Sequence, residues 1–137
     1  MEVLRGQEHL KCIRLSPGGT FRFFAACCNT PIANTRPGEP WAGFLRCVYT
    51  NGGGAQELDQ LLGPVRSRIM GRYARGTPPA GTLKKFDLKA VLTVLPFMLK
   101  GMWQGKARPS PFFAADGVTA IVAPHVLSDA EQRAVLE

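Results

Sequence analysis

The order of apolar and polar residues near the N-terminus predicts a β-hairpin. Apolar and polar side chains alternate over residues 8–15, which is the period of a half-buried strand and places Cys12 on its core-facing side. Residues 16–20 form a Ser-Pro-Gly-Gly-Thr turn sequence, in which proline fixes one dihedral angle and glycine can adopt positive φ. The aromatic run over residues 21–26 then predicts the second strand.

The same pattern predicts a third strand and a short helix further along the chain. The second strand runs into a tight turn at residues 27–32. A loop at residues 34–40 leads to a third strand expected at residues 41–50. Leucines at positions 58, 61 and 62 share one face of a short helix that Gly63 and Pro64 would end.

Apolar residues spaced by three and four predict an amphipathic helix over residues 86–103, with lysines at positions 85, 89 and 100. Residues 118–123 are predicted to form a final strand. Ser128 and Glu131 have the spacing of a capping box, which predicts that a terminal helix begins there.

These elements predict a mainly β fold with added helices, of the α+β class, in which antiparallel sheets are covered by the basic amphipathic helix. The 137 residues, 45% of them hydrophobic, are enough for a single domain. Within it we expect a β-rich core with the cysteine turn at residues 1–65. A basic loop and helix occupy residues 66–113, and the final strand and C-terminal helix occupy residues 114–137.

The composition favours a cytoplasmic protein with reduced thiols. The start of the chain lacks a secretion signal, and no apolar stretch approaches the roughly 20 residues of a membrane span. Four cysteines are few for a disulfide scaffold, and the cytoplasm keeps thiols reduced. Thiol or metal chemistry is therefore the question that the cysteines raise.

The net charge of +7 is concentrated in one segment. Residues 66–108 hold ten Lys or Arg and one acid, Asp87, so ten minus one gives +9. The ordinary interpretation is a solvated basic face. The alternative is a binding module whose basic helix docks on an anionic membrane surface or an acidic partner. Nucleic acid is not an expected partner, because charge alone supports it and no recognised nucleic-acid-binding motif is present.

Adjacent Cys27 and Cys28 are the candidate metal ligands, since turns that follow strands often supply thiolates to zinc. Neighbouring side chains of an extended strand point to opposite faces, so both could bind one ion only if the backbone bends sharply between them. Otherwise one binds and the other packs. Isolated Cys12 and Cys47 are interpreted as small buried hydrophobes. The two histidines, His9 and His125, lack metal-motif spacing.

Residues 8–19 and 24–35 resemble a family of uncharacterised bacterial proteins related to the glutathione-dependent formaldehyde-activating enzymes, a superfamily that includes centromere protein V. The resemblance continues more weakly over nearly the whole chain. It implies a zinc-bearing β-tent-like fold, in which a late Cys-x-x-Cys-Gly-x-Pro-Leu turn and an early Cys-x-Cys hold a structural zinc. Residues 28–32 match the second half of that turn. Ala25 stands where its first cysteine would be, and Cys27 lies beside Cys28 instead.

The family's early cysteines, including those that hold the catalytic zinc, would lie before Met1. The resemblance therefore implies a partial structural zinc site at Cys27 and Cys28, either of which could carry the metal, and no independent catalysis. If a partner chain or a preceding segment supplied the missing ligands, the implied chemistry would be carbon–sulfur bond lysis or formation on a glutathione adduct. The implied partners are a glutathione-type ligand and a second copy paired through an exposed sheet edge.

Overall fold

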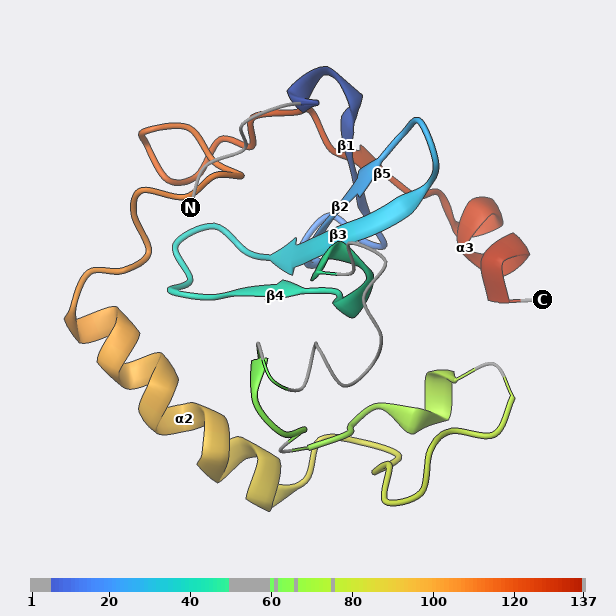
Figure 1. Cartoon of the computed structure of the whole chain (residues 1–137). Coiled ribbons are helices and arrows are strands. Elements are labelled where there is room, and N and C mark those ends of the chain that lie inside the picture. Colours follow the sequence, from blue (N-terminus) through green and yellow to red (C-terminus); the bar gives the residue numbers. More distant parts are fainter. Residues whose placement is uncertain (1–5, 50–59, 61, 66, 75, 137) are drawn as a thin grey trace. The chain divides into compact units, whose positions relative to one another are not determined.

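The computed structural model describes residues 6–49, 60, 62–65, 67–74 and 76–136, without the side chains of residues 46, 47, 89, 135 and 136. The described residues fall into two compact units. One joins the residues up to Tyr49 with those from Gly101 onward, and the other extends from residue 60 to Lys100. The predicted α+β class with mainly β content is confirmed by a five-stranded mixed sheet accompanied by helices (Figure 1).

The first unit contains all five strands and both ends of the described chain. Its elements, in chain order, are η1 (Gln7–His9), β1 (Leu10–Arg14), β2 (Phe21–Ala25), β3 (Thr30–Thr35), β4 (Ala42–Phe44), η2 (Arg46–Tyr49), β5 (His125–Val126) and α3 (Asp129–Leu136). The second unit contains η3 (Gly71–Tyr73) and most of α2 (Leu88–Trp103). None of the helices in the described segments is long and apolar enough to cross a membrane.

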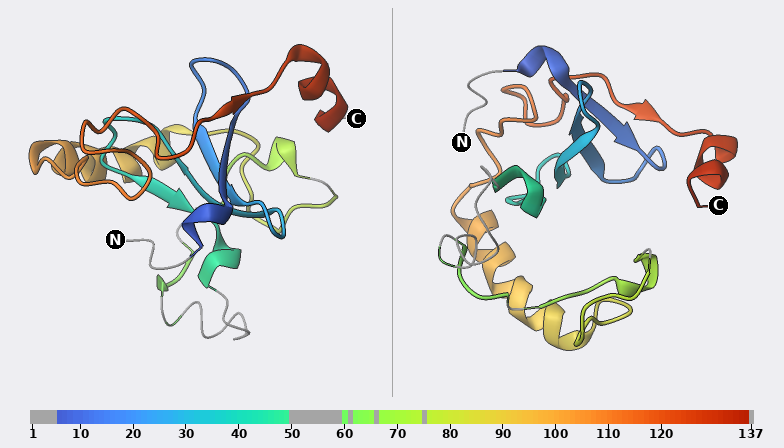
Figure 2. Two further views of the ribbon diagram at one scale, coloured as in Figure 1. Left: turned by 90° about the horizontal axis from the view of Figure 1, so that it is seen from above. Right: turned by 45° about the vertical axis from the view of Figure 1, so that its right-hand side comes forward.

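The strands form one sheet in the order β4-β3-β2-β1-β5, and the two further views let the reader follow the chain through it (Figure 2). Neighbours are antiparallel from β4 to β1, whereas β5 runs parallel to β1. The predicted hairpin is confirmed, because β1 and β2 pair with Leu10 opposite Ala25 and Ile13 opposite Arg22. The sheet as a whole is mixed, since its last pair is parallel.

The prediction for residues 27–40 was wrong in one respect. The turn closes by residue 29, and the chain returns at once as β3, which occupies part of the predicted turn and loop. Asn29 adopts φ 55°, a left-handed conformation that asparagine tolerates better than most residues and that helps a short turn reverse the chain. Thr30, Ile32 and Thr35 are β-branched, which favours extended backbone once the chain has reversed.

The predicted third strand at residues 41–50 is shortened to β4. After Phe44, the Leu45 N–H still donates to the Ile32 carbonyl, but the Val48 N–H donates back to the Leu45 carbonyl and the chain coils into η2. Cys47 therefore lies in a short 3-10 helix rather than a strand. The side chain of Cys47 is not among the described ones, so the prediction that it is buried stays a prediction. Residue 50, the last of the predicted strand, also lies outside the described residues.

The final strand was predicted at residues 118–123, but the structure has a turn there and places β5 at His125–Val126. The Asp116 carboxylate accepts hydrogen bonds from the Val118 and Thr119 amides, both at 2.9 Å, and from the Thr119 hydroxyl. These bonds hold the backbone in a turn. The β-pairing described for this segment is a single antiparallel bridge between Phe113 and Ala120.

The core lies on one face of the sheet. Alternate residues of the first three strands are buried, together with two consecutive phenylalanines that follow α2: Leu10, Cys12, Phe21, Phe23, Ala33, Phe112 and Phe113. Phe112 stacks on Phe23 with ring centroids 4.5 Å apart. Cys12 is 3% exposed, so its prediction as a buried hydrophobe is confirmed.

A helix is present where residues 86–103 were predicted to form one, as α2 begins at Leu88 and ends at Trp103. It begins where the Asp87 carboxylate accepts a hydrogen bond of 2.8 Å from the Ala90 amide, which is an N-terminal cap. The short helix predicted around the leucines at 58, 61 and 62 lies largely outside the described residues.

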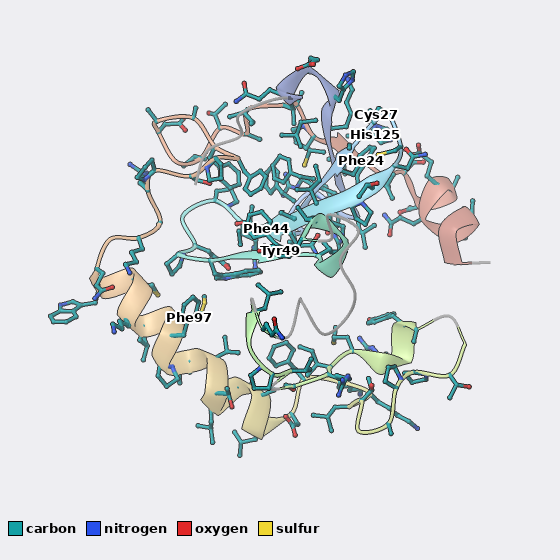
Figure 3. All side chains as sticks on the ribbon, in the orientation of Figure 1. Phe24, Cys27, Phe44, Tyr49, Phe97 and His125 are labelled. Atoms are coloured by element: carbon teal, nitrogen blue, oxygen red, sulfur yellow. The ribbon has the colours of Figure 1, made fainter. Side chains whose placement is uncertain are left out.

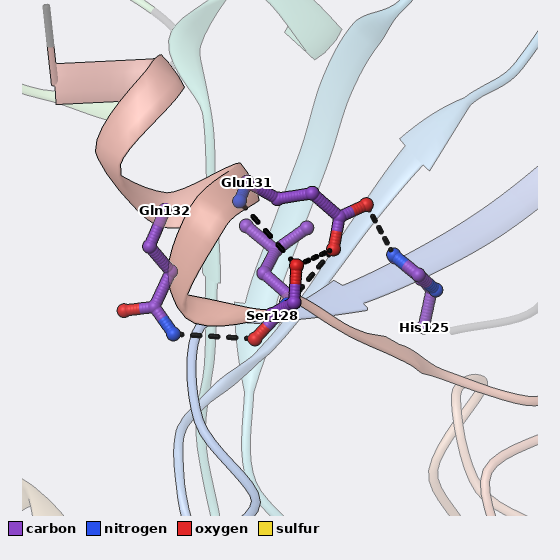
Figure 4. A network of polar contacts seen from close by, with 5 residues as sticks. His125, Ser128, Glu131 and Gln132 are labelled. Carbon is purple, nitrogen blue, oxygen red and sulfur yellow. Dashed lines mark hydrogen bonds and ion pairs between the residues drawn. The ribbon is translucent and has the colours of Figure 1, made fainter.

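The predicted capping box at the last helix is confirmed (Figure 4). The Ser128 amide and hydroxyl donate to the Glu131 carboxylate at 2.8 and 2.7 Å, and the Glu131 amide donates back to the Ser128 hydroxyl at 3.4 Å. His125 Nε2 lies 3.0 Å from the second carboxylate oxygen. Hydrogen bonds from Ser128, with a smaller contribution from His125, lower the pKa of Glu131 to about 2.

This capping network predicts an acid-sensitive α3. Because the folded-state pKa of Glu131 lies below its ordinary value of 4.5, its stabilising effect is complete above that value and is lost as the pH falls toward about 2. Glu131→Gln should lower the amide-exchange protection of α3 at neutral pH. The difference between wild type and variant should shrink as the pH is lowered from 4.5 to 2. A difference that stays constant over this range would contradict the role given to the carboxylate.

Candidate functional site

The turn between β2 and β3 places Cys27 and Cys28 at the end of a hairpin. Ala25 pairs with Thr30 across the two strands, and the Cys28 amide donates to the Ala25 carbonyl at 3.4 Å. The chain therefore reverses within residues 26–29. The two cysteines lie in bent backbone, which is the condition under which neighbouring side chains can meet.

Both thiols are exposed and lie close together, and Figure 3 labels Cys27 at this turn. The Sγ atoms of Cys27 and Cys28 are 3.7 Å apart, with the Cys27 thiol donating toward the Cys28 sulfur. The alternative in which the two side chains point to opposite faces therefore does not hold. The structure brings the two sequence-predicted residues together.

Thr30 gives the two thiols different acidities. Its hydroxyl lies 3.0 Å from the Cys28 sulfur. Hydrogen bonding from the Thr30 hydroxyl, and then from its backbone, lowers the pKa of Cys28. The hydrogen bond to Cys28 raises the pKa of Cys27. Cys28 is therefore the thiol that ionises first. Sequence reasoning missed Thr30, although a hydroxyl two residues after a turn cysteine is a usable signal.

This difference predicts selective alkylation. Under limiting iodoacetamide at neutral pH, Cys28 should react before Cys27, because the thiolate is the nucleophile. Buried Cys12, whose pKa is raised by desolvation, should react slowest of the three. Thr30→Val keeps the side-chain shape but removes the hydroxyl, and it should reduce the preference for Cys28. Tandem mass spectrometry of the modified peptide measures both outcomes. Unchanged selectivity in the valine variant would contradict the assignment.

The separation of the two sulfurs is close to what one tetrahedral zinc ion imposes on a pair of thiolates. With Zn–S bonds of about 2.3 Å, two sulfur ligands lie about 3.8 Å apart, against 3.7 Å here. In the described part of the chain, no third metal ligand joins these two thiols, because no group of three or more His, Cys, Asp or Glu residues gathers there. Cys12 belongs to the core, and His125 contacts Glu131.

A groove of about 440 Å³ lies beside the turn on the face of the sheet that carries Arg22 and Phe24. Asn29 of the turn is part of its wall. The remaining walls come from β1, β2, β3 and the residue after β4: Ile13, Arg22, Phe23, Phe24, Pro31, Asn34 and Leu45. Sequence reasoning did not predict this groove. The alternation of Arg22 and Phe24 with the buried Phe21 and Phe23 is the signal that could have revealed it.

Similarity to known proteins is found at the level of a protein family. The model of a family described as "Family of unknown function (DUF6151)" matches residues 1–122. No curated protein and no solved structure matches the chain. The matched range includes the cysteine turn, α2 and the core phenylalanines Phe112 and Phe113, and it ends before β5. Because the match covers most of the 137 residues, the chain belongs to this Family of unknown function (DUF6151).

Proposed function

We propose that this protein binds a structural zinc ion through Cys27 and Cys28, and that a second copy of the chain supplies the remaining two thiolates. The observation that supports this function is the 3.7 Å separation of two exposed sulfurs at a hairpin end. Zinc is a borderline-soft ion that readily takes thiolate ligands in a tetrahedron. In this proposal both cysteines are ligands.

The second copy follows from the number of donors. Structural zinc sites are almost always four-coordinate, and the described residues of one chain bring two thiolates together. Two hairpin ends that meet around one ion give a site of four cysteines. Both thiols are exposed, so another chain can reach them without unfolding either sheet. A glutathione-type thiol is the competing source of the missing ligands.

The proposal includes the finer features that the resemblance implies. The sheet is β-tent-like, and the fold is related to the formaldehyde-activating superfamily. The protein works in the reducing cytoplasm, where its thiols stay available. Its zinc is structural, and the chain has no independent catalysis. Carbon–sulfur lyase chemistry on a glutathione adduct would need further ligands from outside the described residues.

Zinc titration of the metal-free protein, followed by light scattering on a sizing column, tests this function. Added zinc should convert monomers to dimers at one zinc per two chains. Cys28→Ser should stay monomeric, whereas Thr30→Val, which keeps both thiols, should still dimerise. Failure to take up zinc would overturn the proposal. Uptake of one zinc per monomer only in the presence of reduced glutathione would overturn the role of the second copy.

A second candidate function is favoured by the exposure of α2. Several of its large apolar side chains are uncovered, with Phe97 62% and Trp103 89% exposed, and Lys100 lies among them. Exposed apolar surface beside positive charge is typical of helices that lie in an anionic membrane interface. We propose an anionic membrane surface as the partner of α2.

Sedimentation with phosphatidylserine-containing vesicles tests the second candidate. The protein should bind these vesicles at low salt, bind neutral phosphatidylcholine vesicles weakly, and lose binding in Phe97→Ser. A matched control is Leu62→Ser, an exposed apolar position outside α2. Equal binding to neutral and anionic vesicles, or none to either, would overturn this function. The second result would favour α2 as a cover for the sheet or as a site for an acidic protein.

A further inference from the structure

We infer that the Cys27–Cys28 pair of a single chain binds trivalent arsenic compounds, with both sulfurs bonded to one arsenic atom. The inference rests on the same two thiols as the proposed zinc site. It does not need the second copy of the chain. The ligand class is a compound of the form R–As(OH)₂, the hydrated form of an organic arsenic(III) oxide.

The geometry of the pair favours an atom between the sulfurs over a direct disulfide bond. Consecutive Cα atoms lie about 3.8 Å apart across a trans peptide, whereas disulfide-linked cysteines usually have Cα atoms about 4.4–6.8 Å apart. A disulfide would also require the sulfurs to approach to about 2.04 Å from 3.7 Å. A bridging atom lets them stay near their present separation. The geometry of the pair therefore favours two bonds to one bridging atom.

The number of donors favours trivalent arsenic as that atom within one chain. Arsenic(III) forms three bonds and carries a lone pair, so two sulfurs and one organic group complete its bonding. At this turn two thiols lie together, and no group of three or more His, Cys, Asp or Glu gathers among the described residues. Zinc at the same place lacks half of its four ligands. Exposure of both thiols leaves the third position free for the organic group.

The reaction balances without an oxidant or reductant. Two As–O bonds of R–As(OH)₂ break and two As–S bonds form, one to Cys27 and one to Cys28. Each thiol proton leaves with one hydroxyl group as water, so two water molecules are released. Arsenic stays trivalent and the sulfurs stay at the thiol oxidation level. Closure of the ring is intramolecular once the first As–S bond has formed, which gives the second step a high effective concentration.

Phenylarsine oxide is the probe for a direct test on the full-length, chelator-treated protein. Intact-mass spectrometry should show one phenylarsenic group per chain, with Cys27 and Cys28 both blocked against later alkylation. The adduct should survive excess 2-mercaptoethanol, a monothiol, and be removed by 1,2-ethanedithiol, because only a dithiol can replace both bonds at once. Light scattering should show that the adduct is a monomer.

The single variants Cys27→Ser and Cys28→Ser provide the decisive comparison, because both positions are exposed and either variant should fold. Each should lose the adduct in 2-mercaptoethanol. An adduct in the wild type that 2-mercaptoethanol removes, or one that persists in both variants, would overturn the inference. Zinc uptake without a stable arsenic adduct would overturn this inference alone. A stable arsenic adduct without zinc uptake would overturn the zinc function alone.

Discussion

Phe112→Ala should destabilise the sheet unit by about 3–5 kcal/mol, the range measured for removing a fully buried phenylalanine ring. Phe112 is 1% exposed, and its ring stacks on Phe23 at 4.5 Å and packs near Phe44. Alanine leaves a cavity that three strands and the segment after α2 cannot easily fill. Domains are commonly stable by only about 5–15 kcal/mol, so the variant should lose a large share of its stability.

Urea unfolding monitored by far-ultraviolet circular dichroism measures this loss. Phe97→Ala is the matched control, because the same ring is removed from an exposed position. Surface substitutions usually change the free energy of unfolding by no more than about 0.5 kcal/mol. Equal losses in the two variants would contradict the placement of the core on the face of the sheet that Phe112 covers.

Replacing Cys27 and Cys28 together by serine should abolish zinc binding while leaving the fold intact. A serine hydroxyl is a poor zinc ligand in comparison with a thiolate, which binds at about 2.3 Å. Both side chains are exposed in a turn, so their replacement removes no core contact. Elemental analysis of the purified protein gives the zinc content, and circular dichroism gives the secondary structure.

Cys12→Ala is the control for this experiment. It removes a thiol from the core while both turn cysteines remain, so its zinc content should equal that of the wild type. Zinc retained by the serine double variant would show that the metal lies elsewhere. Loss of secondary structure in the double variant together with loss of zinc would mean that the metal contributes to folding, as structural zinc often does.

The sequence was most informative where the structure depends on neighbouring residues. Alternation over residues 8–15 and the Pro-Gly-Gly turn predict the first hairpin, because both strands and their connection are local. The capping box at Ser128 is local as well. The strand β3 was missed because the left-handed conformation of Asn29 lets the chain reverse fully by that residue, whereas the sequence indicates a longer turn and loop. The strand β5 was misplaced because its partner β1 is more than a hundred residues away.

The candidate site was found from sequence only in part. Adjacent Cys27 and Cys28 stand out in the sequence, but their spacing alone left open whether the side chains meet. Their convergence depends on the turn conformation that closes at Asn29. Thr30 lies only two residues after Cys28, so its hydroxyl is a local signal that the sequence analysis did not use. The groove beside the turn depends on how three strands pair, which no local pattern contains.

X-ray absorption at the zinc edge of the purified protein tests the central claim most directly, because it reports the kind of atom bonded to the metal and its distance. We predict a shell of four sulfur atoms at about 2.3 Å, two from each of two chains. The shell should disappear with the metal when Cys27 and Cys28 are both serine. A shell of nitrogen or oxygen atoms at about 2.0–2.2 Å without sulfur would contradict the assignment of these two thiols as the zinc ligands.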